Sequence, residues 1–588
     1  MCAFAAAAVA LPLTAVGAPA VQRSLLVVST TSDAVNGTVT SPAALIAHPG
    51  PDGISLREAI MASDHATGFQ AITFAPALAG KTITPRGSLP SFTHPATALV
   101  GPTDADGQPT VTLDAANVTI AGTGLLSVLA SNTSISHVRI VDLRGENVPG
   151  IAVWAGGRGG EQHVDGVAIV SNVIDNAGAP GTGMIVGTPY GPTPVSGAEL
   201  SNVTIARNVI QGLTGDGINV ALPGMSCGID GLVIEENAFI DDAGRSDPAL
   251  ELGSNFTDNT TTGTQIVKNV FSGDRTAVFV DGGLAMLNEG TGQVIPASGD
   301  VNTGTVIAQN VFRGDANALQ FVGGLGSVHA TGDEVTNVDV SDDLIVDNDA
   351  PTSTPIYVFG GTDGATGSSV SGVRFVNDTI AGNSGGDLYV DAGSGNQVSG
   401  IEVANTILWG NGSAGRGPSA GAVTFTSSLS GVDPVFAGTD DFHLTAGSPA
   451  IDAALAPDAP EHDLEDRARV GTPDIGAYEF GAAPRPTLDV DAADLGGVGR
   501  IASSPAGITC TLVCGAAFDA GTQVTLTALP ATGSTFAGWS APCAGKGSCR
   551  VVVGAATSVT ATFAPPGPPV QVSRCSGSAV LCRRPATP

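Results

Sequence analysis

The chain has 588 residues, with 80 glycines, 4% aromatic and 13% charged residues and a mean hydropathy of +0.25. This length exceeds one ordinary hydrophobic core, and the composition excludes a disordered chain and predicts a β-rich, turn-rich protein of several domains or repeats. The formal net charge of −31 comes from 54 acidic and 23 basic residues. Such a surface repels phosphates, so nucleic acid and anionic membranes are excluded as expected partners.

The first 20 residues read MCAFAAAAVALPLTAVGAPA and are predominantly apolar. The apolar run is too short to span a bilayer, and Ala18-Pro19-Ala20 fits the small-residue cleavage site of an exported protein. We therefore predict a signal peptide over residues 1–20, with an N-terminal core segment as the alternative. No later stretch is long and apolar enough to predict a membrane span, so the expected location is secreted or cell-surface.

Residues 55–63 read SLREAIMAS and predict a short helix near the start of the folded region. Ser55 is a suitable N-cap, and Glu58 three residues later completes a capping box. The segment resembles the N-terminal part of exported bacterial β-helix proteins with a Cys-Ser-Leu-Arg-Glu-Ala signature, with Ile54 in place of the Cys. This helix is expected to cover the open edge of the first coil of a repeat structure.

A ten-residue pattern, TVIAQNVFRG at residues 305–314, recurs along the chain. Its other copies begin at residues 167, 203, 232, 264, 338, 373 and 401, at spacings of 28 to 41 residues. Position three is always Ile, Val or Phe, and position eight is always Ile, Phe or Leu. Strict alternation would put these two positions on opposite faces of one strand, so the pattern predicts a bend between two short strands.

Positions five and six of the pattern are polar for different reasons. Position five varies freely, so we expect it to face solvent; it holds Ser171, Arg207, Glu236, Lys268, Gln309, Asp342, Asn377 and Asn405. Position six is nearly constant: Asn172, Asn208, Asn237, Asn269, Asn310, Asp343, Asp378 and Thr406. Asparagine tolerates the left-handed backbone region, so position six is expected to form the corner and to stack its amides from coil to coil.

A further short strand follows most corners, as in DGINV from Asp216, AVFV from Ala277 and DLYV from Asp387. At least three strands per coil predict an all-β, right-handed parallel β-helix of the pectate-lyase-like type over residues 21–480. The alternative, a β-propeller, requires four strands and a longer period per blade. Residues 433–480, ending in DIGAYEF, resemble the closing rungs of secreted β-helix proteins of the choice-of-anchor Q type.

The sequence changes character after a linker at residues 481–486. Residues 487–564 are Thr-rich and alternating, contain the motif GSTFAGWS, and resemble the divergent internalin-type B-repeat of bacterial surface proteins. The resemblance implies a spacer or adhesive module, in which Trp539 is expected in the core rather than as a ligand platform. A Pro-rich tail covers residues 565–588.

Eight cysteines are unevenly placed, and Cys227 stands alone. Because an exported protein meets an oxidising environment, disulfides are favoured over a zinc site for the six cysteines that follow Cys227. The predicted disulfide-forming residues, whose pairing the sequence does not select, are Cys510, Cys514, Cys543, Cys549, Cys575 and Cys582.

Candidate chemistry is confined to acidic residues near the corners. Asp241 and Asp242, with Asp216 one coil earlier, resemble the acidic constellation of polygalacturonase-type hydrolases, but the Gly-His-Gly and Arg-Ile-Lys motifs of that family are missing. Asp216 also belongs to a set of Asp residues that recur just before the short strand that follows the corner. A turn-forming role explains this recurrence. That set is Asp216, Asp247, Asp274, Asp315 and Asp387.

Weaker binding candidates are Asp247, Glu251, Arg245 and Arg275, in and beside the same loop. The loop offers oxygen ligands for calcium but lacks the spacing of an EF-hand, so no metal residue is assigned and no cofactor is expected. Aromatic residues that could stack on sugars are few and scattered: Trp154, Tyr190, Tyr357, Tyr389 and Trp409. Lys268, at a variable outward position, is expected to be surface decoration.

The leading hypothesis is therefore a secreted or cell-surface β-helix protein that serves binding, adhesion or display, with a polysaccharide or cell-surface glycan as partner. The alternative is a polysaccharide lyase or glycoside hydrolase that acts on an acidic polysaccharide through the acidic loops. The sequence identifies neither the ligand nor the oligomeric state.

Overall fold

The computed structural model describes residues 24–564 apart from short gaps. The gaps are residues 105, 120–123, 146–147, 158–159, 190–194, 241–246, 254–256, 289–292, 327–329, 350–353, 363, 414, 495–498, 506, 511–512 and 531–534. The signal peptide, Asp241, Asp242, Arg245, Cys575, Cys582 and the tail therefore lie outside the described residues. Within them, no helix is long and apolar enough to cross a membrane.

The chain divides into two compact units. The larger runs to Pro486 and includes Ala517–Ala520, and the smaller comprises Thr487–Ala516 and the strands that follow Gly521.

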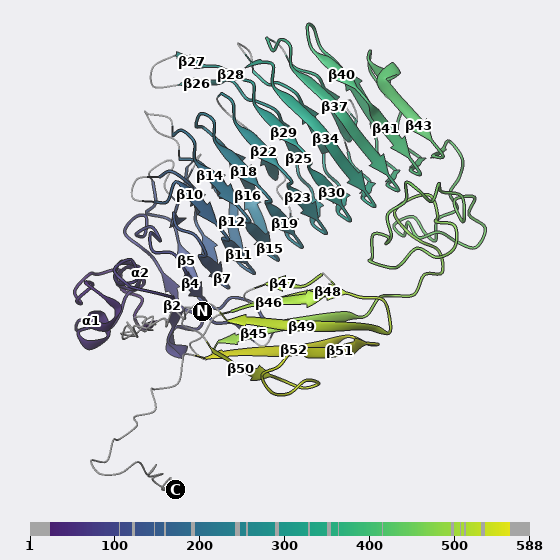
Figure 1. Ribbon diagram of the computed structural model, residues 1–588. Coiled ribbons are helices and arrows are strands. Elements are labelled where there is room, and N and C mark those ends of the chain that lie inside the picture. The colour runs from purple at the N-terminus through teal and green to yellow at the C-terminus, as the bar shows by residue number, and fades with distance from the viewer. Residues whose placement is uncertain are drawn as a thin grey trace, which may run out of the picture. The chain divides into compact units, whose positions relative to one another are not determined.

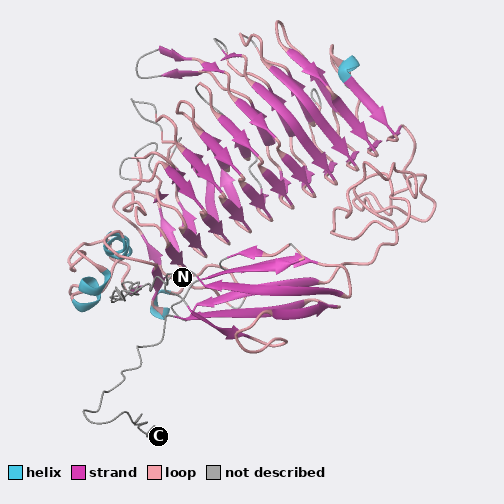
Figure 2. Ribbon diagram, viewed as in Figure 1, coloured by secondary structure: helices cyan, strands magenta, loops and turns pink. Residues whose placement is uncertain are grey.

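The larger unit is a right-handed parallel β-helix, as the repeat predicts (Figures 1 and 2). In the part of the chain that the structure describes, the coils form three parallel sheets of 19, 12 and 9 strands. The propeller alternative is wrong, because consecutive coils pair in parallel and in register rather than forming separate four-stranded blades.

The first sheet runs from β1 (Ser24–Val28) to β43 (Val423–Thr426), and the second from β3 (Thr82–Ile83) to β44 (Leu429–Ser430). The third sheet has nine strands: β6 (Leu126–Val128), β9 (Pro149–Trp154), β13 (Thr182–Gly187), β17 (Ile218–Ala221), β21 (Leu250–Leu252), β25 (Thr276–Asp281), β32 (Asn317–Val322), β36 (Ile356–Phe359) and β39 (Leu388–Asp391). Apolar side chains from all three sheets form one continuous core. In that core, the rings of Phe239, Phe271 and Phe312 stack from rung to rung at centroid distances of 4.6 and 4.9 Å.

Two short helices precede the first complete coils, α1 (Pro42–Ala47) and α2 (Leu56–Ser63). The predicted capping box is present in α2: Ser55 Oγ accepts the N–H of Glu58, and the Glu58 carboxylate accepts the N–H of Ser55. The buried Glu58 also accepts the N–H groups of Asn36 and Gly37, and Arg57 holds Asp33. Helix α2 contacts β1 and β2 (Gln70–Phe74), so the signature segment closes the N-terminal end of the coil.

The corner differs from the sequence prediction by one position. The left-handed residue is position five, where φ lies between +50° and +58° in all eight copies. Position six is not left-handed, and its side chain turns inward, with Asn172, Asn208, Asn237, Asn269 and Asn310 at most 1% exposed. Asparagine is therefore selected at position six for its amide and not for its backbone freedom.

The inward asparagines form what we call the inner Asn column: Asn172, Asn208, Asn237, Asn269 and Asn310. In Asn310, Oδ1 accepts the N–H and the Nδ2–H of Asn269 at 2.8 and 3.0 Å. Its own Nδ2 donates to Ile266 O and to Asp343 Oδ1, both at 2.9 Å. The same bonds repeat up the column, which confirms the predicted stacking of amides.

Two more polar columns lie at the other corners of the coil. In each, a side-chain oxygen accepts the backbone N–H of its counterpart one coil earlier. One column contains Asp274, Asp315, Asn348, Asn383 and Asn411. The other contains Cys227, Asn259, Asp300, Asp333, Ser368 and Asn396. Asp274 and Asp315 thus have the corner role that their recurrence predicts.

The closing segment, residues 433–480, packs against the position-five residues of the later coils. Lys268 pairs with Asp466, and Arg469 pairs with Asp342 and, at 3.2 Å, with Glu479. Asn377 donates to Asp474 O at 2.8 Å. The prediction that position five faces solvent is therefore wrong for these coils, and Lys268 is not surface decoration. No repeat pattern could reveal these contacts, because the closing segment meets the position-five residues across 97 to 198 residues of sequence.

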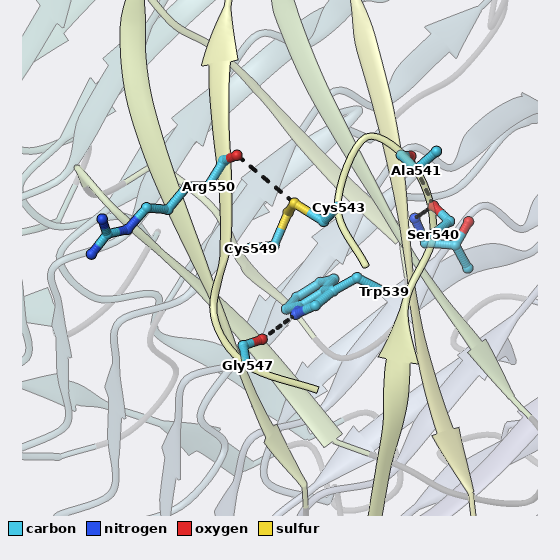
Figure 3. Close-up of a disulfide and its surroundings, with 8 residues drawn as sticks. Trp539, Ser540, Ala541, Cys543, Gly547, Cys549 and Arg550 are labelled. Atoms are coloured by element: carbon cyan, nitrogen blue, oxygen red, sulfur yellow. Dashed lines mark hydrogen bonds between the residues drawn. A yellow bond between two sulfur atoms is a disulfide. The ribbon is translucent and has the colours of Figure 1, made fainter. Parts of the chain in front are cut away.

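The smaller unit has two four-stranded sheets. One contains β45 (Thr487–Asp494), β48 (Val513–Ala517), β50 (Thr535–Trp539) and β52 (Thr557–Ala564), and the other contains β46 (Gly499–Ser504), β47 (Thr509–Cys510), β49 (Thr522–Pro530) and β51 (Cys549–Val553). Cys543 and Cys549 form a disulfide beside Trp539 (Figure 3). Trp539 is 7% exposed and its Nε1 donates to Gly547 O at 2.7 Å, so it is a core residue. For Cys510 and Cys514 the disulfide stays a prediction.

Candidate functional site

The outer face of the third sheet carries a row of residues that does not repeat. Strand register aligns one outward position across seven coils, and we call these residues the outer row: Ile185, Asn219, Glu251, Phe279, Gln320, Tyr357 and Tyr389. Their inward neighbours, such as Leu250 and Leu252 beside Glu251, are fully buried in the common core. The backbone is thus regular, while the outward chemistry changes from apolar to acidic to aromatic.

The N-terminal end of this face is covered. Leu129, Ala152, Trp154 and Ile185 form a small apolar cluster outside the main core, and each is at most 5% exposed. Trp154 is therefore a packing residue there and not an open platform for a sugar.

The C-terminal end of the face is open and aromatic. Tyr357 and Phe359 stack with a centroid distance of 5.4 Å and an interplanar angle of 6°. Tyr389 lies 5.6 Å from the first ring and 5.9 Å from the second. All three side chains, which we call the aromatic group, are half-buried. The sequence pointed to Tyr357 and Tyr389 but as scattered residues; adjacent coils bring them together, and Phe359 contacts both rings.

A pocket of about 530 Å³ adjoins this group. Phe359 forms one wall, and Thr362, Asp391 and Ser394 supply polar groups. The remaining lining includes Gly393, whose φ is +71° and where a Cβ would lie 2.3 Å from the carbonyl oxygen of Gly361. A side chain at Gly393 would therefore clash with the neighbouring backbone, so this part of the lining is formed by glycine.

Three carboxylates lie on the same face, one on each of three successive coils. Asn219 Nδ2 donates to Asp216 Oδ2 at 2.8 Å and to Glu251 Oε2 at 3.1 Å. A Cβ at Gly253 would lie 2.7 Å from Asp281 Oδ2 and 3.3 Å from Glu251 Oε1, so both carboxylates gather over this glycine. Asp281 is fully buried, Asp216 is 8% exposed and Glu251 is half-buried. We call Asp216, Glu251 and Asp281 the carboxylate cluster.

The environment favours a protonated Glu251. Burial raises the pKa of Glu251 well above its ordinary value of 4.5, and the negative charges of Asp216, Asp281 and Asp247 raise it further. Like charges at close range cannot all ionise cheaply, so one carboxyl keeps its proton.

The structure brings together some of the predicted site residues and separates others. Asp216 and Glu251 meet in the carboxylate cluster, and Asp247 is near enough to act on Glu251 electrostatically. Arg275 is exposed, immediately before β25. Asp387 is paired with Arg416.

Sequence reasoning missed Asn219, Asp281, Phe359 and Asp391. A signal was available in the sequence. Aligning the short strands that follow successive corners places these four residues in two outward columns. The recurrence of Asp before that segment drew attention to turn-formers instead. No group of three or more His, Cys, Asp or Glu side chains in the described residues is arranged to hold a metal ion. Asp241 and Asp242, which offer oxygen ligands for calcium in the acidic loop, lie outside the described residues.

Comparison with known protein families identifies one domain. Residues 501–567 match the family described as the divergent InlB B-repeat domain, which confirms the resemblance seen in the sequence. No curated protein sequence matches the chain.

Solved structures that resemble the chain are β-helix proteins. The mannuronan C-5 epimerase AlgE6 A-module of Azotobacter vinelandii is 13% identical, covers 64% of this chain and 95% of its own, and has a TM-score of 0.37. Pectate lyase Pel9A is 14% identical, with coverages of 78% and 96% and a TM-score of 0.30. The tailspike gp49 of Acinetobacter baumannii bacteriophage Fri1, a capsular polysaccharide depolymerase, is 10% identical, with coverages of 84% and 78% and a TM-score of 0.33.

At these identities and scores the likeness says nothing about what this chain binds. The chain combines a right-handed parallel β-helix with a region that matches the divergent InlB B-repeat domain.

Proposed function

We propose that this protein is an exported glycan-binding protein that holds a carbohydrate on the outer face of its third sheet. The observation that carries the proposal is the aromatic group, three half-buried rings that adjoin a pocket whose lining includes Asp391. The predicted signal peptide and the B-repeat region support export and display at or beyond the cell surface.

The chemistry of the pocket suits a sugar ring. A pyranose presents a patch of C–H groups on one face and hydroxyl groups around its edge. Aromatic side chains bury the C–H patch, and a few placed polar groups fix the hydroxyls. Phe359 supplies the apolar wall, Asp391 supplies acceptor oxygens, and Thr362 and Ser394 supply hydroxyl groups. The fold aligns these residues by strand register, because Phe359 and Asp391 are partners on neighbouring strands.

The proposal is tested by measuring glycan binding of the full chain on a polysaccharide panel, before and after Tyr389→Ala and Phe359→Ala. Each change should weaken binding about tenfold or more, the effect of losing a stacking contact of roughly 1.4 kcal/mol. Phe425→Ala is the control, because Phe425 is 39% exposed but lies on β43 of the first sheet. Unchanged binding in the first two variants, or equal loss in the control, would reject the site.

Glycoside hydrolysis is a second candidate function, favoured by the raised pKa of Glu251. A protonated Glu251 could donate a proton to the leaving glycosidic oxygen, while an ionised Asp216 or Asp281 takes a proton from the attacking water. The products would be two shorter glycans, one with a new reducing end. Release of reducing ends by the wild-type chain, abolished in Glu251→Gln, would support this activity. Binding with no release from any bound glycan would reject it.

A further inference from the structure

We infer that the bound glycan is a neutral polysaccharide several sugars long, which crosses the carboxylate cluster, and not a polymer of uronic acids. This inference rests on the proposed function and names the ligand class of the same site. It concerns the whole outer row from Glu251 to Tyr389, whereas the proposed function needs only the aromatic group and its pocket.

The length follows from strand register. Glu251, Phe279, Gln320, Tyr357 and Tyr389 are direct partners on five successive strands. Neighbouring strands are about 4.8 Å apart, so the row from Glu251 to Tyr389 is roughly 19 Å long. Four of these five side chains are half-buried, and Phe279 is 7% exposed, so a glycan would pass over the Phe279 ring. A chain of several sugars along the row would contact the aromatic group at one end and reach the carboxylate cluster at the other.

The charge of this face disfavours an anionic ligand. Strands β9 to β39 of the third sheet contain no Lys or Arg. Arg416, next in sequence after these strands, is paired with Asp387 and stacked over Phe425. Arg275 precedes β25 and is exposed to solvent. A uronate carboxylate that crossed β21 would meet Asp216, Glu251 and Asp281 with no cation from the sheet between them, and repulsion is strongest where water is displaced.

The polar groups along the row suit hydroxyls. Gln320 is half-buried between Phe279 and Tyr357 and offers both a donor and an acceptor. Asn219 is committed through Nδ2 to the two carboxylates that it bridges. Carboxylate oxygens accept hydrogen bonds from sugar hydroxyls, whereas the ionised carboxylate group of a uronate has no hydrogen to donate. The row therefore matches a hydroxyl-rich, uncharged chain.

The test uses pairs of polysaccharides with one backbone and two charges. One pair is highly methyl-esterified polygalacturonan and its de-esterified form, and the other is a neutral β-glucan and its carboxymethyl derivative. The full chain should bind the neutral member of at least one pair roughly tenfold more tightly than the acidic member at low salt. High salt should narrow that ratio, because the repulsion is electrostatic.

Asp216→Asn keeps the size of the side chain and removes a carboxyl group from the carboxylate cluster. This variant should narrow the preference for the neutral member over the acidic member. Asp339→Asn is the matched control, because Asp339 is an exposed residue of the first sheet, and it should leave that preference unchanged.

The outcomes separate the two proposals. If Tyr389→Ala abolishes binding but both members of a pair bind equally, or the acidic one binds better, the charge inference fails and the glycan-binding site stands. If no neutral member of the pairs or of the panel binds, this inference fails. If no glycan of either kind binds, both fail.

Discussion

The inner Asn column and the outer row both run from coil to coil, but they follow opposite rules. Along the inner column five successive coils have the same residue, and each amide hydrogen-bonds to the next. Along the outer row no two neighbours are alike until Tyr357 and Tyr389. A side chain that must hydrogen-bond to its equivalent one coil away repeats from coil to coil, because the geometry of that bond allows little change. A residue that departs from the repeat is free to meet something outside the protein.

The largest expected effect is on the scaffold side, at Arg469. Its side chain is 2% exposed and pairs with the equally buried Asp342 and Glu479. Removing one partner of a buried ion pair leaves uncompensated charge, so Arg469→Met should lower the free energy of unfolding by about 3–5 kcal/mol. Urea unfolding followed by circular dichroism measures this. A loss below about 1 kcal/mol would mean that the closing segment does not hold the later coils.

The next largest effect should come from the inner Asn column itself. Asn310→Ala removes two donated and two accepted hydrogen bonds in a fully buried position. The abandoned groups cost about 1–3 kcal/mol each, so a total loss of roughly 3 kcal/mol or more is expected. Gln320→Ala removes a similar amide from the outer row and should cost less than about 1 kcal/mol. Equal losses of unfolding free energy in Asn310→Ala and Gln320→Ala would mean that the inner Asn column contributes no more to stability than the outer row.

A smaller, pH-dependent effect on stability is expected in the polar column that contains Asn259, Asp300 and Asp333, where two positions are acids instead of amides. Burial raises the pKa of Asp300 to about 8 and that of Asp333 to about 6. A raised pKa means that the folded state holds a proton that the unfolded state releases. This stability is fully present below the ordinary pKa of 3.8 and is lost as the pH rises through 6 and 8.

The corresponding variant is Asp300→Asn, which gives this column the residue that Asn259 already provides one coil earlier. The wild-type free energy of unfolding should fall between pH 5 and 9 by up to roughly 1.4 kcal/mol per pH unit for each proton. The variant should show a shallower fall over that range. Asp339→Asn, on the exposed side of the first sheet, is the control. A wild-type stability that rises through this range would contradict a protonated Asp300.

The smallest effect on stability is expected in the aromatic group. Tyr357→Ala removes a half-buried ring from the outer face, while the inward neighbours Ile356 and Val358 stay in the core. The free energy of unfolding should fall by no more than about 1 kcal/mol, while glycan binding should drop sharply. Thermal unfolding and binding measured on the same sample give both numbers.

The repeat could be read from the sequence because it is enforced inside the coil. Apolar positions three and eight, the near-constant Asn172 to Asn310 and the period together predicted the β-helix. The left-handed residue was misplaced by one position, because asparagine suits both a left-handed corner and a stacked amide. Only coordinates show that variable residues such as Gln309, with φ of +57°, take the corner.

The candidate site was harder to predict because it has no internal pattern. Glu251 and Tyr389 lie 138 residues apart in the sequence. Only the strand register places them in one row, four strands apart. Alignment of the strands places Asp281 in an outward column, but nothing in its own segment indicates that Gly253 leaves room for its carboxylate beside Glu251. Contacts between distant segments, such as Arg469 with Asp342, follow no repeat and could not be predicted either.

The central claim is that the inner Asn column stabilises the fold and that the outer row binds the ligand. The most direct test measures unfolding free energy and glycan affinity for the wild-type chain, Asn310→Ala and Tyr389→Ala in parallel. We expect Asn310→Ala to lose roughly 3 kcal/mol of stability while its folded fraction binds like wild type. Tyr389→Ala should lose about tenfold or more in affinity with stability nearly unchanged. Binding lost in Asn310→Ala and retained in Tyr389→Ala would contradict the claim.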